Sequence, residues 1–210
     1  LILAPRWGLA ELALVEGDAE AALEACRDAL SLAESSGERA LFVPFVVTGT
    51  RAALLARRPN EAERWLEATR ALLAGWPRQA GPALDHAEGL VRTATGSTVV
   101  ARSLLESAIA GWDTLGRTWE GQWARLDLAS CMLRSNREAE ALAVVRATAE
   151  RADALGSVPL RRRADDLLAI ARSRGAEEEP WRPLTAREFE VARLVADGMT
   201  NGAIAEQLRL

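Results

Sequence analysis

Polar turns interrupt the sequence at nearly regular intervals from Trp7 to about Arg174. Between the turns, apolar residues recur with the spacing of amphipathic helices, and no stretch keeps the alternation that a half-buried strand requires. The alanines near the starts of successive helices recur roughly every 40 residues and are Ala21, Ala62, Ala101 and Ala139. A recurrence of this length, in which each unit is a helix pair, predicts an all-α chain folded as an α-solenoid of antiparallel helix pairs.

The first unit, residues 17–30, reads Gly-Asp-Ala-Glu-Ala-Ala-Leu-Glu-Ala-Cys-Arg-Asp-Ala-Leu. It resembles the second half of a tetratricopeptide repeat (TPR), in which small residues let neighbouring helices approach closely. The later units exceed that repeat's usual ~34 residues and lack its Trp and Pro landmarks, so the predicted solenoid, residues 1–174, is TPR-like. Because proline breaks a helix interior, we expect one helix to begin near Pro44, with residues 40–43 in a turn. We expect the last helix of the solenoid to run from about residue 159 to residue 173.

A different organisation follows the solenoid. Residues 175–183 are acidic and contain two prolines, which predicts a linker. Thr185 and Glu188 have the spacing of a capping box, with Leu184 and Phe189 spaced as a hydrophobic staple. Gly198 is suited to the left-handed turn that ends a helix, and Thr200 can cap a second helix. The predicted inner faces of these two short helices are Val191, Leu194 and Val195 on the first and Ile204, Ala205 and Leu208 on the second.

Residues 184–208 contain the pattern Leu-Thr-x-Arg-Glu-x-Glu-Val, then Leu-x-Ala-x-Gly-x-Thr-Asn, then Ile-Ala-x-x-Leu. This pattern resembles the start of the LuxR-type (GerE-like) helix-turn-helix domain, from which Ala192 and Ala203 depart. In that family a third helix enters the DNA major groove, and it would follow Leu210. We therefore expect residues 184–210 to be a partial DNA-binding domain.

The MalT-like large LuxR-type regulators join a solenoid to such a domain, and this chain is similar to the junction of the two parts. The resemblance implies a cytoplasmic, signal-responsive bacterial transcription regulator whose solenoid senses an effector or mediates assembly. The resemblance also implies an ATP-binding module, which such regulators carry and which would lie upstream; this chain contains no Gly-x-x-x-x-Gly-Lys-Ser/Thr loop.

Candidate DNA contacts lie in the C-terminal segment. Thr200 and Asn201 begin the second helix, where exposed amides favour a phosphate, and Arg187, Arg193 and Arg209 are candidate phosphate contacts. However, residues 184–210 hold three arginines against four acidic residues, and the whole chain has a net charge of −4. We therefore predict that this chain alone binds operator DNA weakly or not at all, because phosphate contacts position a protein without specifying sequence.

Three tryptophans, Trp112, Trp119 and Trp123, admit two interpretations. Aromatic side chains commonly fill helix–helix interfaces, so solenoid core is the favoured one. The alternative is an aromatic wall of an effector groove on the concave face, where a small molecule or a protein would bind; a homo-oligomer is a further prediction. The run 161–163, Arg-Arg-Arg, reads either as a phosphate-contacting cluster or, preferably, as a helix face paired with Asp165 and Asp166.

Catalytic and metal sites are not predicted. His86 is the only histidine, and no cysteine or second histidine lies at metal-ligand spacing. No serine stands in a Gly-x-Ser-x-Gly elbow. Cys26 and Cys131 fit core positions in a reducing compartment, and no apolar run is long enough to span a membrane. We therefore expect a cytoplasmic protein without enzymatic activity, cofactor or metal.

Two other functions fit parts of the pattern. The promoter-recognition end of a sigma factor shares a Gly-x-Ser/Thr-x-x-x-Ile-Ala-like pattern, although Asn201 and the solenoid argue against it. A helical-repeat adaptor that binds a protein and never touches DNA is the alternative from another class.

Overall fold

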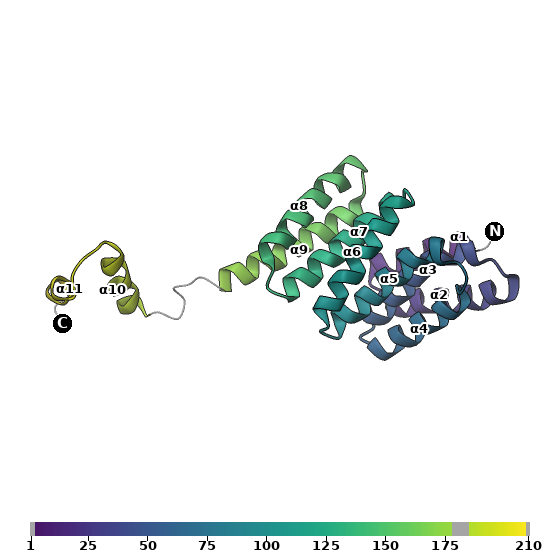
Figure 1. The fold of residues 1–210 in the computed structure, drawn as a ribbon, viewed down its shortest axis with the longest axis horizontal. Helices are drawn as coiled ribbons and strands as arrows, with labels where there is room; N and C mark the ends of the chain where they lie inside the picture. Colours follow the sequence, from purple (N-terminus) through teal and green to yellow (C-terminus); the bar gives the residue numbers. More distant parts are fainter. Residues whose placement is uncertain (1–2, 178–184, 209–210) are drawn as a thin grey trace. The chain divides into compact units, whose positions relative to one another are not determined.

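The structure is a computed structural model that describes residues 3–177 and 185–208, and all its regular elements there are α-helices (Figure 1). They are α1 (Leu3–Glu16), α2 (Ala19–Ser36), α3 (Arg39–Leu55), α4 (Pro59–Leu72), α5 (Pro77–Ala94), α6 (Thr98–Thr114), α7 (Thr118–Arg134), α8 (Glu138–Ala154), α9 (Val158–Glu177), α10 (Ala186–Ala196) and α11 (Asn201–Leu208). The chain divides into two compact units, Leu1–Leu168 and Ala169–Leu210. The predicted all-α fold is therefore confirmed for the described residues.

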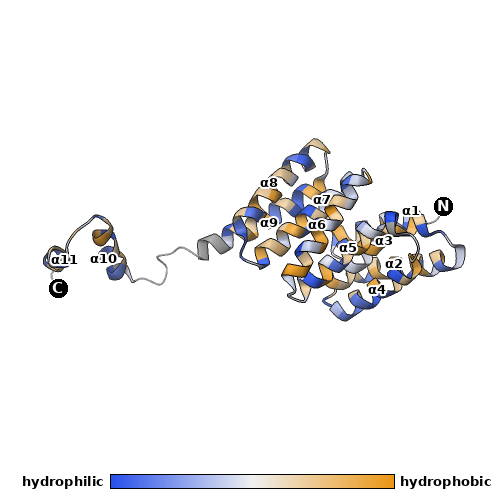
Figure 2. Ribbon diagram, viewed as in Figure 1, coloured by the Kyte–Doolittle hydropathy of each residue, from blue (hydrophilic) through white to orange (hydrophobic). Residues whose placement is uncertain are grey.

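The first unit is built from two layers of helices. The odd-numbered helices α1, α3, α5 and α7 pack side by side, and α2, α4 and α6 each pack against the odd-numbered helices before and after them. Hydrophobic and hydrophilic residues alternate along each helix, so that each has an apolar side (Figure 2). This is the architecture of a solenoid of antiparallel helix pairs.

In the repeat, α2, α4, α6 and α8 each bury an equivalent stripe of residues, which for α4 ends at Leu73 just after the helix. The four stripes are Ala22, Cys26, Ala29 and Ala33; Ala62, Leu66, Thr69 and Leu73; Ala101, Leu105, Ala108 and Trp112; and Ala141, Val145, Thr148 and Ala152. The predicted positions Ala62 and Ala101 are confirmed, whereas Ala21 and Ala139 are exposed. The stripe begins at Ala22 and Ala141 because those residues, and not the first alanine after the turn, face the neighbouring helices.

The prediction that a helix begins near Pro44 is wrong, because Pro44 lies inside α3. A proline in a helix interior costs about 3 kcal/mol through its missing amide and a steric clash. Around it, however, α3 buries Phe42, Val43, Phe45 and Val46. Complete burial of each such side chain contributes roughly 1.5–3 kcal/mol, so packing outweighs the proline and the helix continues through it.

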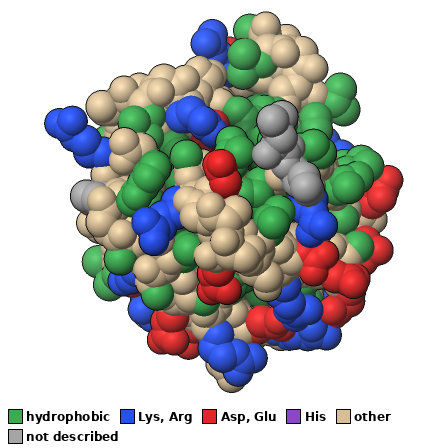
Figure 3. Space-filling view, turned by 90° about the vertical axis from the view of Figure 1, so that its right-hand side faces the viewer, with side chains coloured by type: hydrophobic (Ala, Val, Ile, Leu, Met, Phe, Trp, Pro, Cys, Tyr) green, Lys and Arg blue, Asp and Glu red, His purple; other side chains and the backbone are tan. Residues whose placement is uncertain are grey.

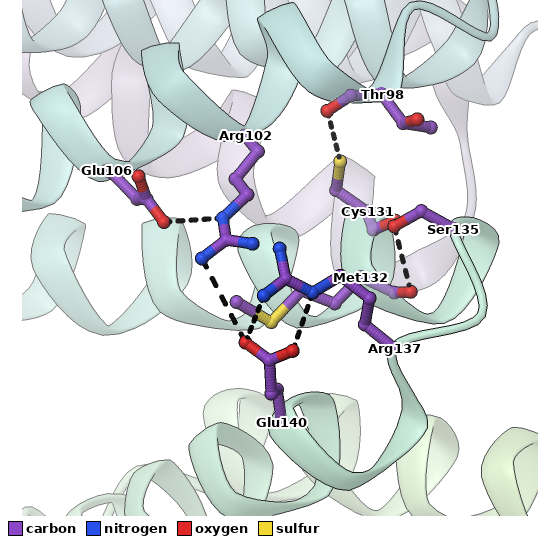
Figure 4. Close-up of polar contacts among 8 residues, drawn as sticks. All are labelled: Thr98, Arg102, Glu106, Cys131, Met132, Ser135, Arg137 and Glu140. Atoms are coloured by element: carbon purple, nitrogen blue, oxygen red, sulfur yellow. Dashed lines mark hydrogen bonds and ion pairs between the residues drawn. The ribbon is translucent and has the colours of Figure 1, made fainter.

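Polar contacts link α6, α7 and α8 (Figure 4). Glu140 of α8 accepts two hydrogen bonds of 2.6 Å from Arg137 and lies 3.9 Å from a guanidinium nitrogen of Arg102 in α6. The thiol of Cys131 donates to the Thr98 carbonyl at 3.4 Å. Cys26 and Cys131 are both free and buried, as predicted for core residues.

In the second unit, α9 ends at Glu177, so its last three residues lie in the segment predicted as a linker. The remainder of that segment, together with Leu184 of the predicted staple, lies outside the described residues. Helices α10 and α11 bury Leu194, Ile204 and Leu208, with Val191 and Met199 packed against them. Val195 was predicted on this inner face but is 54% exposed, because two short helices share an interface too narrow to cover it.

Candidate functional site

The layer of odd-numbered helices brings three charged or polar side chains together from three different helices. Asp127 of α7 accepts a hydrogen bond of 2.5 Å from Arg51 of α3, and the same oxygen lies 2.9 Å from Nε2 of His86 in α5. His86 and Asp127 are buried, whereas the Arg51 side chain is 17% exposed. We refer to these three residues as the buried triad.

The protonation of the triad follows from its partners. The indole of Trp112 donates to Nδ1 of His86 at 3.4 Å, so Nδ1 is an acceptor, and Nε2 carries the proton that it donates to Asp127. Burial lowers the pKa of His86, and this effect outweighs the opposing hydrogen bond to Asp127. Burial alone would raise the pKa of Asp127, but the charge of Arg51 and the hydrogen bond from His86 lower it well below its usual range. The triad is therefore a neutral histidine beside an arginine–carboxylate pair.

The structure places the three predicted tryptophans around this triad. Trp112 is 2% exposed and lies in the core. Trp119 and Trp123 are half-buried and meet edge to face, with ring centroids 6.0 Å apart. The guanidinium of Arg51 lies over the Trp123 ring, 4.6 Å from its centroid, in cation–π geometry. An effector role for these tryptophans stays a prediction.

A small cavity of about 20 Å³ adjoins the triad, lined by residues of α1, α3, α5, α6 and α7. Trp7 donates to the hydroxyl of Thr48 at 3.0 Å, and this hydroxyl donates to Glu11 at 2.6 Å. The cavity has room for about one water molecule. It therefore cannot itself hold an effector.

A larger groove opens beside the triad and has a volume of about 520 Å³. Its lining includes Arg51, Trp123 and Asp127, the apolar side chains of Leu54 and Leu90, and residues of α9. Small-molecule sites commonly enclose 300–1,000 Å³. The indole Nε1 of Trp123 is buried and has no hydrogen-bond acceptor among the described residues. A buried donor without an acceptor is uncommon, and Trp123 lines both this groove and the small cavity.

The Arg-Arg-Arg run separates into two parts. Arg161 pairs with Asp165 at 3.2 Å and with Asp153 at 2.5 Å, as the paired-face interpretation predicts. Arg162 and Arg163 instead line the large groove together with Asp166. The sequence pattern could not separate them, because which arginine faces inward depends on the packing of α9.

The C-terminal segment has the predicted helix caps. The hydroxyl of Thr185 accepts from the amide of Glu188, and the Glu188 carboxylate accepts from the amide of Thr185 at 2.7 Å. This reciprocal pair of hydrogen bonds confirms the capping box. Gly198 has a φ of 79°, and the Thr200 hydroxyl accepts from the amide of Ala203 at 3.4 Å.

The residues predicted to contact DNA differ in whether they are free to reach a phosphate. Thr200, Asn201 and Arg193 are exposed, and Arg209 lies outside the described residues. Arg187 pairs with Glu190 at 3.0 Å and also donates to the carbonyl of Leu208. It therefore links α10 to the end of α11, and a phosphate contact by Arg187 would compete with these bonds.

A metal site and a membrane span are both absent from the described residues. Among the described residues, no group of three or more His, Cys, Asp or Glu side chains could hold a metal ion, and no described helix is long and apolar enough to cross a membrane. At the end of the solenoid seen in Figure 3, basic and acidic side chains are interspersed, so no single charge dominates this face.

The fold and the caps define a class: a TPR-like helical-repeat unit followed by a helix-turn-helix segment. Residues 182–210 match the family of bacterial regulatory proteins called the luxR family. This C-terminal segment is therefore of LuxR type, which favours a DNA-binding regulator. A search of curated proteins found no match to the chain.

Two solved structures share the repeat architecture. Both are of a chain from Podosopora anserina described as a putative kinesin light chain with nearly identical TPR-like repeats. The first is 18% identical, with a TM-score of 0.51, and covers 87% of this chain and 90% of its own. The second, a glutamine-to-methionine variant, is 17% identical, with a TM-score of 0.51, and covers 99% and 97%. At this identity the similarity concerns the fold, and it confirms the predicted TPR-like solenoid.

Proposed function

We propose that the chain is part of a cytoplasmic, signal-responsive transcription regulator of LuxR type. In this proposal the helix-turn-helix segment belongs to a DNA-binding domain, and the solenoid binds an effector or mediates assembly. The protein is not an enzyme. The observation that carries the proposal is the match of residues 182–210 to the luxR family, in a segment whose capping box has the expected hydrogen bonds.

The solenoid supports the sensing part of the proposal through its groove. The groove lies beside the buried triad, and its volume suits a small molecule. The regulator would bind its effector there, with Trp123 forming part of the wall, whereas Trp119 lines only the small cavity beside it. A homo-oligomer formed through the solenoid is the corresponding assembly function, and sedimentation with and without effector would measure it.

A titration of promoter DNA at matched salt tests the regulator function. It compares this chain with a longer version that continues through the expected recognition helix. We expect sequence-specific binding by the longer version and weak or no binding by the chain itself, because the second helix of a helix-turn-helix motif contacts the bases. Comparable specific affinity for both would contradict the assigned roles. No specific binding by the longer version would favour a helical-repeat adaptor, the function that the repeat architecture supports by itself.

A further inference from the structure

The large groove beside the triad continues into a second opening of about 340 Å³, because Leu54, Leu90, Asp127 and Arg163 line both. Five arginines and three acidic residues line the two openings. They are Arg51, Arg57, Arg134, Arg162 and Arg163, and Glu11, Asp127 and Asp166. The combined groove therefore carries an excess of positive charge in a chain whose net charge is −4.

The three acidic residues offset only part of this charge. Asp127 already accepts from Arg51 and His86, and Glu11 accepts from Thr48 at 2.6 Å. Within the part of the chain that the structure describes, no ion pair is formed by the other four groove arginines, Arg57, Arg134, Arg162 and Arg163.

Trp123 also lines the groove, and its indole Nε1 is buried without an acceptor among the described residues. Arginine and tryptophan side chains donate hydrogen bonds and accept none. The groove thus offers more donors than its own acceptors can use, and a ligand must supply the acceptors. Beside these donors lie the apolar side chains of Leu54, Leu55 and Leu90.

We infer that the groove binds a small organic anion. Its carboxylate or phosphate accepts from Arg163 and its neighbouring arginines, and its apolar part covers Leu54 and Leu90. This inference rests on the proposed sensing role of the solenoid and specifies the chemical class of the effector. It does not depend on DNA binding.

The test follows the indole N–H resonances of the protein by two-dimensional NMR, with Trp123→Phe assigning the Trp123 signal. The probes are hexyl phosphate, hexanoate, inorganic phosphate and 1-hexanol. We expect a saturable shift of the Trp123 signal with hexyl phosphate or hexanoate, and none with 1-hexanol. The anion that binds with higher affinity shows whether the groove prefers a phosphate or a carboxylate. A shift by inorganic phosphate alone, with no gain from the hexyl chain, would overturn the apolar part of the inference.

Matched variants separate the groove from the rest of α9. Arg163→Gln should weaken anion binding at least about tenfold, since a hydrogen bond to a charged group contributes roughly 1.5–3 kcal/mol. Arg161→Gln is the control, because Arg161 belongs to the same run but pairs with Asp153 and Asp165. Arg162→Gln replaces the first variant if Arg163→Gln fails to give a folded spectrum.

Three results would overturn the inference: an equal loss of affinity in Arg161→Gln, an equal response to 1-hexanol, or no response to either anion at about 10 mM, well above a millimolar dissociation constant. A response to duplex DNA without a response to the small anions would also refute it. Because the binding test contains no promoter titration, its failure and that of the regulator proposal are distinguishable.

Discussion

His86 should make the free energy of unfolding depend on pH in a range where few other groups titrate. It is the only histidine of the chain, and ordinary aspartates and glutamates titrate below pH 5. In the folded state, burial lowers the pKa of His86, and Nδ1 accepts from the Trp112 indole. Protonation of Nδ1 would destroy this hydrogen bond and place a second positive charge beside Arg51.

The sign and size of the effect follow from linkage. The unfolded chain binds a proton at His86 below about pH 6.5, whereas the folded chain keeps the ring neutral, so stability falls as the pH is lowered. Between pH 7.5 and 5.5, the loss is at most about 1.4 kcal/mol, the free energy of one pKa unit. This limit holds because pH 5.5 lies about one unit below the pKa of the unfolded histidine. For a unit of this size that corresponds to roughly 3–6 °C in melting temperature.

Urea unfolding monitored by circular dichroism at pH 7.5 and 5.5 measures this loss. The comparison is with His86→Gln, which is expected to be less stable at both pH values but nearly independent of pH between them. An unchanged pH dependence in His86→Gln would assign the titration to another group. Greater stability of the unsubstituted protein at pH 5.5 would show that Asp127 raises the pKa of His86 more than burial lowers it, and the argument from desolvation would fail.

Three further predictions concern stability, and the first has a control substitution. Asp127→Ala should lower the free energy of unfolding by about 3–5 kcal/mol, because it leaves Arg51 without its buried partner, whereas Asp113→Ala, which removes an exposed ion pair, should cost less than about 1 kcal/mol in the same urea titration. Gly49→Ala should cost about 1–3 kcal/mol, since the added methyl would lie 2.3 Å from the Trp65 ring; an unchanged melting temperature would contradict this. Thr185→Ala should destabilise α10 by about 1 kcal/mol, and unchanged amide exchange in α10 would refute the role of the capping box.

The solenoid could be predicted from the sequence because its signals are local. Turns and buried stripes recur about every 40 residues, and the period alone indicates stacked helix pairs. The exact register was harder, since Ala21 and Ala22 are both compatible with a helix start and only packing selects Ala22. Pro44 was misjudged for the same reason: its local cost is visible in the sequence, but the burial of Phe42 and Phe45 that offsets it is not.

The buried triad could not be predicted from the sequence, because its contacts join residues far apart in the chain. His86 and Asp127 are 41 residues apart, and Arg51 and Asp127 are 76 apart. Each residue alone resembles an ordinary polar helix residue, and only the stacking of α3, α5 and α7 brings them together. The local signals that pointed to this region were the tryptophans, among them Trp119 and Trp123 four residues apart on one helix, and the arginine run 161–163.

The triad is difficult to explain by stability alone. Removing two charges from water costs several kcal/mol per ion, and a well-packed apolar replacement is often as stable as, or more stable than, a buried ion pair. A solenoid that needed only to stack could therefore fill these positions with leucine, as α6 does at Leu105. What the triad adds is a fixed orientation of Arg51, whose guanidinium is held by Asp127 and lies over Trp123 at the wall of the groove. A guanidinium fixed in this way requires no reordering when an anion arrives, and this reduces the entropic cost of binding. The buried pair and the binding groove thus have one physical explanation.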